Sequence, residues 1–100
     1  MCGRVTLTSA PHELAERFQL DVVPELEPRY NISPGQDLCA VLPDPGGSGR
    51  RARRFHWGLV PPWLQDRPRP PKLINARSET VQDKPLFKRA FAVRRCLVPV

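Results

Sequence analysis

The sequence has no run of about 20 apolar residues and no basic leader followed by an apolar stretch. We therefore expect neither a membrane-spanning helix nor a signal peptide. Cysteine is scarce too: Cys2, Cys39 and Cys96 are odd in number and show no Cys-x-x-Cys spacing, which argues against a disulfide framework and a zinc site. The histidines, His12 and His56, have no metal-like spacing either. We expect no metal, no cofactor and a reducing cytosol.

Long helices are also not expected, because 13 of the 100 residues are proline, against a usual share of about 5%. A chain of this length provides one small domain with a modest core. Residues 5–8 alternate as a strand does, and Ser9 is a candidate cap for a helix with Pro11 in its first turn. The buried stripe expected for this helix is Leu14, Ala15 and Phe18.

Further along the chain, three prolines favour a loop over residues 25–34. The apolar run 38–42 is typical of a buried strand, and the turn cluster DPGGSG joins it to a second strand, RRARRFHWGL, as a hairpin. A proline-rich loop follows at 61–72. A helix is predicted to begin near Lys84 with Asp83 as its cap, and residues 96–100 are predicted to begin a strand.

Charge is distributed unevenly along the chain. Residues 1–49 hold three basic and seven acidic residues, giving −4, whereas residues 50–100 hold thirteen basic and three acidic residues, giving +10; together they make the net +6. A basic half of this kind indicates a surface that binds a polyanion, nucleic acid above all. The alternative is a solvated surface in an arginine-rich chain.

The N-terminal MCGR places a cysteine directly after the initiator methionine. Removal of Met1 would leave Cys2 with a free α-amine and a free thiol, a 1,2-aminothiol that condenses with an aldehyde to form a thiazolidine ring. Both groups titrate near neutral pH in unperturbed form, at about 7.7–8.0 and about 8.5. Taken alone, Cys2 is a weak signal, because most cysteines in intracellular proteins are small buried hydrophobes.

The segment NARSE, residues 75–79, follows two apolar residues and is polar throughout. Asn75 offers one acceptor and two donors for a small polar group, and Arg77 offers a planar fork that matches phosphate oxygens. The segment also fits a helix N-terminus capped by Ser78, and helix N-termini bind anions as well. Trp57 is expected in the core, whereas Trp63, in a proline loop, is expected to be exposed. His12 and His56 are interpreted as surface residues.

Five motifs together resemble the SRAP family of SOS-response-associated peptidases: MCGR at the N-terminus, PRYNISP at 28–34, WGLVPPW at 57–63, INARSET at 74–80 and RRCLVP at 94–99. They occur in the order typical of that family. The resemblance implies an α+β fold with a mixed, largely antiparallel barrel-like sheet and short helices. Residues 1–100 would form the N-terminal part of a single SRAP-like domain that is incomplete at its C-terminus.

The resemblance also implies a function. SRAP proteins lose Met1 by self-processing and capture the aldehyde of an abasic site in single-stranded DNA as a thiazolidine crosslink. Carried over residue by residue, Cys2 is the nucleophile and Asn75 holds the sugar-derived hydroxyl beside the forming ring. The implied DNA-binding residues are Gly3, Arg4, Asn31, Trp63, Arg77 and Ser78, with Tyr30 helping Asn31 to shape the pocket floor. The family's catalytic glutamate and histidine lie after the strand that ends at Val100, so neither is assigned.

Two other functions are compatible with these residues. One is a noncovalent single-stranded DNA-binding module, inert through truncation or through retention of Met1. The other is a thiol peptidase, as the family name suggests, although no Cys-His pair is evident in the sequence. In each case we expect a monomer without a membrane partner. A DNA-binding form would be found in the bacterial cytoplasm and, when bound to DNA, with the nucleoid.

Overall fold

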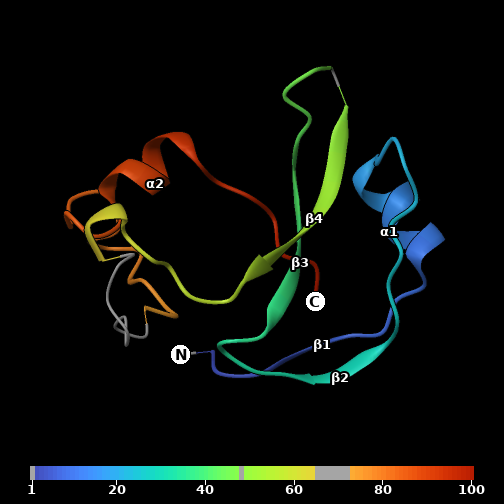
Figure 1. Ribbon diagram of the computed structural model, residues 1–100, viewed down its shortest axis with the longest axis horizontal. Coiled ribbons are helices and arrows are strands. Elements are labelled where there is room, and N and C mark those ends of the chain that lie inside the picture. Colours follow the sequence, from blue (N-terminus) through green and yellow to red (C-terminus); the bar gives the residue numbers. More distant parts are fainter. Residues whose placement is uncertain (1, 48, 65–72) are drawn as a thin grey trace.

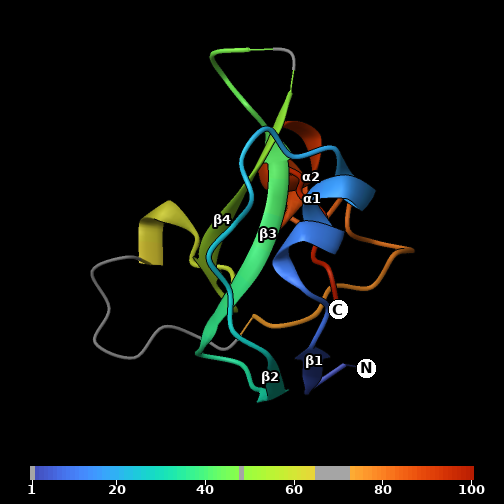
Figure 2. The same ribbon diagram turned by 90° about the vertical axis from the view of Figure 1, so that its right-hand side faces the viewer.

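The computed structural model describes residues 2–47, 49–64 and 73–100. Its elements, in chain order, are β1 (Val5–Leu7), α1 (Pro11–Phe18), β2 (Arg29–Ile32), β3 (Asp37–Pro43), β4 (Arg50–His56), the 3₁₀ turn η1 (Pro62–Leu64) and α2 (Lys88–Val93). The β3–β4 hairpin stands at the centre, with α1 and α2 on opposite sides of it and the β1–β2 pair at one end (Figure 1). The view turned by 90° shows the same arrangement, with α1 in front of the hairpin (Figure 2).

The hairpin confirms the prediction made from the apolar run and the turn cluster. All seven residues of β3 pair antiparallel with β4 in unbroken register, from Asp37 opposite His56 to Pro43 opposite Arg50. Three consecutive β3 residues are buried, 39–41. The predicted strand at 96–100 is reduced to one bridge, in which Leu97 exchanges two backbone hydrogen bonds with Val41 on the other edge of β3.

The prediction of a loop over residues 25–34 is wrong for its second half, because β2 occupies Arg29–Ile32 and pairs with β1. The prolines at 28 and 34 flank the strand without entering it, so no ladder hydrogen bond is lost to a missing N–H. The pairing is irregular: Val5 faces Ile32 but Leu7 faces Arg29. Three steps on β2 therefore oppose two on β1, which is a β-bulge at Tyr30 and Asn31.

The helices differ from expectation at their ends. Ala10 stands at the N-cap of α1 with no side-chain cap, so Ser9 does not cap this helix. Leu14 is buried as predicted, and Ala15 and Phe18 are half-buried. In α2, the helix begins at Lys88 instead of Lys84, and residues 78–83 and 85–87 form turns. Asp83 and Ser78 therefore cap no helix.

The core lies between β1, α1, β2 and one face of the hairpin. Its buried members are Leu7, Leu14, Ile32 and Cys39, with Phe18, Ala52 and Trp57 among the half-buried side chains packed against them. The described residues form two separate two-stranded antiparallel sheets. The α+β class is thus confirmed, but the predicted barrel is not present in the described part of the chain. No helix there is long and apolar enough to cross a membrane.

A tight turn at Ser33–Gln36 joins the two sheets. The Gln36 N–H donates to the Ser33 carbonyl at 3.1 Å, and Gly35 has φ of +90°. Proline followed by a residue of positive φ is the signature of a type II turn, which glycine adopts without strain. Trp57 holds this turn from outside, because its carbonyl accepts from Gly35 at 3.1 Å and its N–H donates to Gln36 at 2.9 Å. These two hydrogen bonds fix the end of β4 against the turn that follows the bulged strand β2.

A substitution of Ile32 tests this core, because Ile32 is 2% exposed and lies on β2 in the same buried cluster as Leu14 of α1. We expect Ile32→Ala to lower the free energy of unfolding by about 2–5 kcal/mol, since the change removes buried methyl groups and leaves a cavity. Val22→Ala is the control, because Val22 is 76% exposed and its truncation should change stability by less than about 0.5 kcal/mol. Urea unfolding followed by circular dichroism measures both. Equal midpoints for the two variants would contradict the core described here.

Candidate functional site

The N-terminal segment is held by a residue far along the chain. The side-chain amide of Asn75 donates from Nδ2 to the carbonyl oxygen of Cys2 at 2.9 Å, across a separation of 73 residues. The Cys2 thiol remains exposed and lies 3.6 Å from the carbonyl oxygen of Arg4. The structure thus brings together the two residues that were predicted to be catalytic. Asn75 contacts the Cys2 backbone, so it fixes the residue that would carry both the amine and the thiol.

Asn75 is itself positioned by the two residues that precede it. Leu59 donates its backbone N–H to Leu73 at 2.9 Å, and the indole Nε1 of Trp57 donates to the carbonyl of Ile74 at 3.3 Å. Trp57 is half-buried, so its N–H needs an internal partner, and the Ile74 carbonyl supplies it. Sequence reasoning placed Trp57 in the core alone and missed this positioning role. The only hint in the sequence was that Trp57 lies in the WGL motif and Ile74 in the INAR motif, two of the five motifs that resemble the SRAP family.

Arg4 and Asn31 form the second part of the site. The guanidinium of Arg4 donates from Nη1 to Oδ1 of Asn31 at 2.8 Å. Asn31 reaches Arg4 because of the bulge on β2. In a regular strand one of Tyr30 and Asn31 would face the core, whereas here both are exposed and Ile32 alone is buried. The bulge thus re-aims two polar side chains toward the N-terminal segment.

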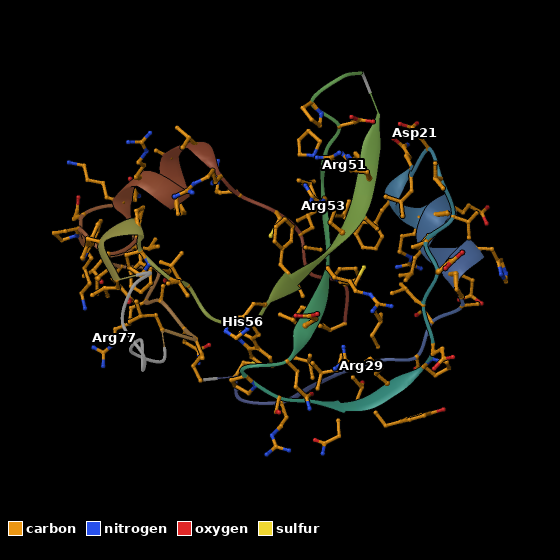
Figure 3. All side chains as sticks on the ribbon, in the orientation of Figure 1. Asp21, Arg29, Arg51, Arg53, His56 and Arg77 are labelled. Atoms are coloured by element: carbon orange, nitrogen blue, oxygen red, sulfur yellow. The ribbon has the colours of Figure 1, made fainter. Side chains whose placement is uncertain are left out.

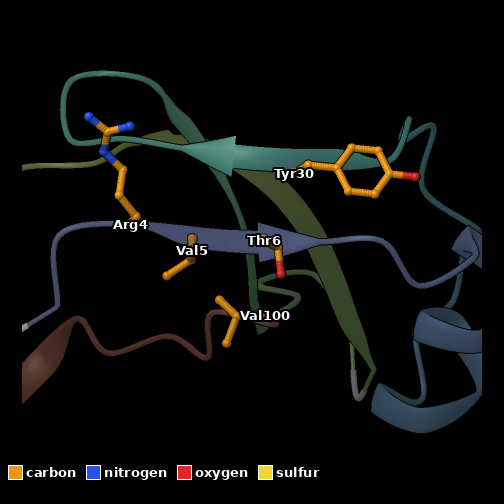
Figure 4. Close-up of a pocket in the computed structure, with 5 residues that line it drawn as sticks. All are labelled: Arg4, Val5, Thr6, Tyr30 and Val100. Atoms are coloured by element: carbon orange, nitrogen blue, oxygen red, sulfur yellow. The ribbon is translucent and has the colours of Figure 1, made fainter.

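Beside Arg4 lies an open pocket of about 350 Å³, lined by Arg4, Val5, Thr6, Tyr30 and Val100. Figure 4 shows Val5 and Val100 pointing toward each other across it. Tyr30 lines this pocket, but Asn31, Cys2 and Asn75 do not. Gly3 connects the two regions: a Cβ added to it would meet no atom within 4 Å, so the space beside its backbone is open.

Three of the predicted DNA-binding residues stand apart from this cluster. Trp63 is 63% exposed, on η1 between the buried Pro61 and Leu64, as predicted. Arg77 and Ser78 are exposed in the turns that follow Asn75, where the Arg77 carbonyl accepts from Thr80 and Val81. The Ser78 hydroxyl lies 3.5 Å from the Glu79 carboxylate. In the described residues no hydrogen bond connects these three to Cys2.

The three thiols differ in environment. Cys39 is buried in β3, and this burial raises the pKa of its thiol, an effect that the charge of Arg54 partly offsets. Cys96 is exposed and lies outside any strand, contrary to the expectation of an apolar strand position. Cys2 is also exposed, and it differs from Cys96 in that its backbone carbonyl accepts a hydrogen bond from the Asn75 side chain. Within the described ranges, no three His, Cys, Asp or Glu side chains gather as a metal site would require.

Comparison with known proteins shows the family to which this sequence is similar. The model of the family described as SOS response associated peptidase (SRAP) matches residues 1–100. The abasic site processing protein YoaM of Bacillus subtilis is 41% identical over 102 residues, which cover 99% of this chain and 44% of the relative. YoqW of the same organism is also 41% identical, and YedK of Escherichia coli is 32% identical over 88% of this chain and 40% of its own length.

The chain therefore spans less than half the length of the curated relatives that it matches. No solved structure matches it. The family match covers the N-terminal MCGR segment, the bulged β2 and the Asn75 segment, which are the parts of the chain that the fold brings together. This chain belongs to the SRAP family of SOS-response-associated peptidases.

Proposed function

We propose that this protein captures abasic sites in single-stranded DNA through Cys2, after removal of Met1. The observation that carries the proposal is the hydrogen bond from Asn75 to the Cys2 carbonyl, which fixes the backbone of an exposed N-terminal cysteine. The relatives named as abasic site processing proteins support the same lesion as the target. A DNA target would place the protein with the genome, in the bacterial cytoplasm.

The chemistry needs only the aminothiol and the lesion. The Cys2 amine attacks the ring-opened aldehyde carbon and water leaves, giving a Schiff base. The Cys2 sulfur then adds to the imine carbon, the thiol proton passes to nitrogen, and a five-membered thiazolidine closes with one water lost overall. Holding the thiol beside the imine makes the second step intramolecular, which favours it over hydrolysis. Because Nδ2 of Asn75 is directed to Cys2, its amide oxygen is left to accept from the sugar hydroxyl.

DNA binding would come from the residues around this centre. Arg4, held by Asn31, and Arg77, two residues after Asn75, would contact phosphates, with Ser78 beside them. The exposed ring of Trp63 offers a surface on which a base would stack. A noncovalent DNA-binding module would use the same residues without the Cys2 chemistry. A peptidase reading has less support, since His12 and His56 lie on α1 and at the end of β4 and neither hydrogen bonds to Cys2.

We expect Cys2→Ser to form little stable adduct with an abasic oligonucleotide. The amine alone gives a Schiff base that water hydrolyses, so the variant should be trapped only by borohydride. Cys96→Ser, which changes the other exposed thiol, should capture as the wild type does. A form that retains Met1 should capture nothing, because its Cys2 nitrogen is an amide. Intact mass spectrometry measures all four proteins, and a stable adduct on the Met1-retaining form would falsify the aminothiol mechanism.

The substitution Gly3→Ala tests whether a DNA strand approaches the backbone of Gly3 closely. An added Cβ at Gly3 meets no protein atom, and Gly3 does not have a positive φ, so the fold should be unaffected. If the DNA strand approaches the Gly3 backbone, we expect the methyl group to slow crosslinking by about tenfold. Gly47→Ala is the matched control, because Gly47 is equally open but lies in the hairpin turn. Unchanged crosslinking in both variants would exclude close approach at Gly3.

Arg77→Ala should weaken binding to single-stranded DNA more than Arg89→Ala, an exposed position on α2 that carries the same charge. If Arg77 neutralises one phosphate, its loss should also reduce the slope of log K against log salt by about 0.7, whereas Arg89→Ala should leave the slope unchanged. Fluorescence anisotropy at several salt concentrations gives both quantities. Equal effects of the two substitutions would mean that only the total charge matters.

A further inference from the structure

Strand β4 carries an unusual concentration of positive charge that the site described above does not use. Four of its seven residues are arginine: Arg50, Arg51, Arg53 and Arg54. Each lies opposite an apolar residue of β3, respectively Pro43, Leu42, Ala40 and Cys39. The acid on β3, Asp37, lies opposite His56. No carboxylate therefore stands directly across the ladder from any of these guanidinium groups.

The two faces of β4 have different surroundings. Successive side chains alternate between faces, so Arg54 shares a face with Ala52, a residue packed against the core. Arg54 lies close enough to Cys39 for its charge to act on the thiol pKa. Arg50 donates to the carbonyl of Phe18 at 3.4 Å, so it is tied to the end of α1. Arg50 and Arg54 therefore belong to the same face of β4 as Ala52.

The opposite face of β4 presents Arg51, Arg53 and Phe55, here called the β4 stripe. Phe55 is 42% exposed, and the Arg53 guanidinium lies 5.8 Å from its ring centroid. Arg51 is half-buried, and its Nε is itself buried and has no hydrogen-bond partner in the described residues, so only the outer part of its guanidinium could meet a ligand. Cations beside an exposed aromatic ring are a combination with which proteins bind single strands, the cations on phosphates and the ring on a base.

The β4 stripe leads toward the crosslinking site. Figure 3 marks Arg51 and Arg53 along β4 and His56 where the strand ends. The next residue, Trp57, donates to the Ile74 carbonyl, and the adjacent Asn75 holds Cys2. A chain of direct contacts thus connects the end of the stripe to the nucleophile. A DNA strand that entered the site would pass close to the stripe on one side.

We propose that the β4 stripe binds the single-stranded DNA that flanks the captured lesion. The inference rests on the proposed function, which supplies the DNA. Arg51 and Arg53 are two residues apart, about 6.6–6.8 Å along the strand, so they form a short row of cations suited to a phosphate backbone. An acidic peptide would satisfy the guanidinium groups but would offer no base to stack on the exposed part of the Phe55 ring. Duplex DNA keeps its bases stacked and would not use the ring either.

The test compares Arg51→Gln/Arg53→Gln with Lys88→Gln/Arg89→Gln, which removes the same charge from exposed positions on α2. The probe is an undamaged oligothymidine of about 20 nucleotides, here called the long probe, which is longer than a typical site of about 4–16 nucleotides. We expect the stripe variant to bind the long probe at least about fivefold more weakly than the α2 variant does, with a salt slope smaller by about 1.4. Phe55→Leu should weaken long-probe binding about fivefold without changing the slope.

The outcomes separate this inference from the proposed function. If the stripe and α2 variants bind the long probe equally, with circular dichroism showing both folded, the stripe does not bind DNA. The assignment is also wrong if polyglutamate binds the wild type as tightly as the long probe does and binds the stripe variant more weakly, or if duplex DNA shows the same dependence on Phe55. If the wild type forms no adduct with abasic DNA but long-probe binding still depends on the stripe, the stripe is supported and the crosslinking proposal fails.

Discussion

Trp57 is the residue on which the positions of the other site residues depend. Its backbone carbonyl and N–H hold the turn at Ser33–Gln36, which joins the bulged strand β2 to β3. Its ring packs against the core, and its indole N–H donates to Ile74, next to Asn75. Because an aromatic ring is rigid and its N–H is a single directed donor, one side chain can set the distance between two segments. The distance between the turn at Ser33–Gln36 and the segment that carries Asn75 therefore depends on Trp57.

The site is assembled from segments with little regular structure of their own. Cys2 and Gly3 precede β1, and Asn75 lies between a bridge and a turn, so neither segment is held by a ladder of backbone hydrogen bonds. A side-chain amide on a backbone carbonyl takes the place of that ladder. Such a contact fixes the Cys2 backbone while leaving the thiol exposed, which is compatible with the proposed role of Cys2 as a nucleophile. A buried thiol such as Cys39 has its pKa raised by burial and is held in its protonated form.

Positive charge and apolar packing are largely divided between the two strands of the central hairpin, with the half-buried Arg51 as an exception. The residues of β3 fill the interior, and the arginines of β4 place their charge at the surface while their aliphatic stems lie beside apolar neighbours. Repulsion among the arginines would oppose this arrangement in isolation. If the stripe binds DNA as proposed, bound phosphate would relieve this repulsion, and the same charge would cost some stability in the free protein.

The sequence by itself determined the hairpin, the apolar run of β3, the exposure of Trp63 and the family, because each depends on residues adjacent in the chain or on motifs that need no coordinates. It did not determine β2, because the prolines at 28 and 34 favour a loop and the strand depends on pairing with the distant β1. The Arg4–Asn31 and Cys2–Asn75 contacts join residues 27 and 73 positions apart. Only tertiary structure decides such contacts, because they depend on a bulge and on an indole donor whose partners no local pattern specifies.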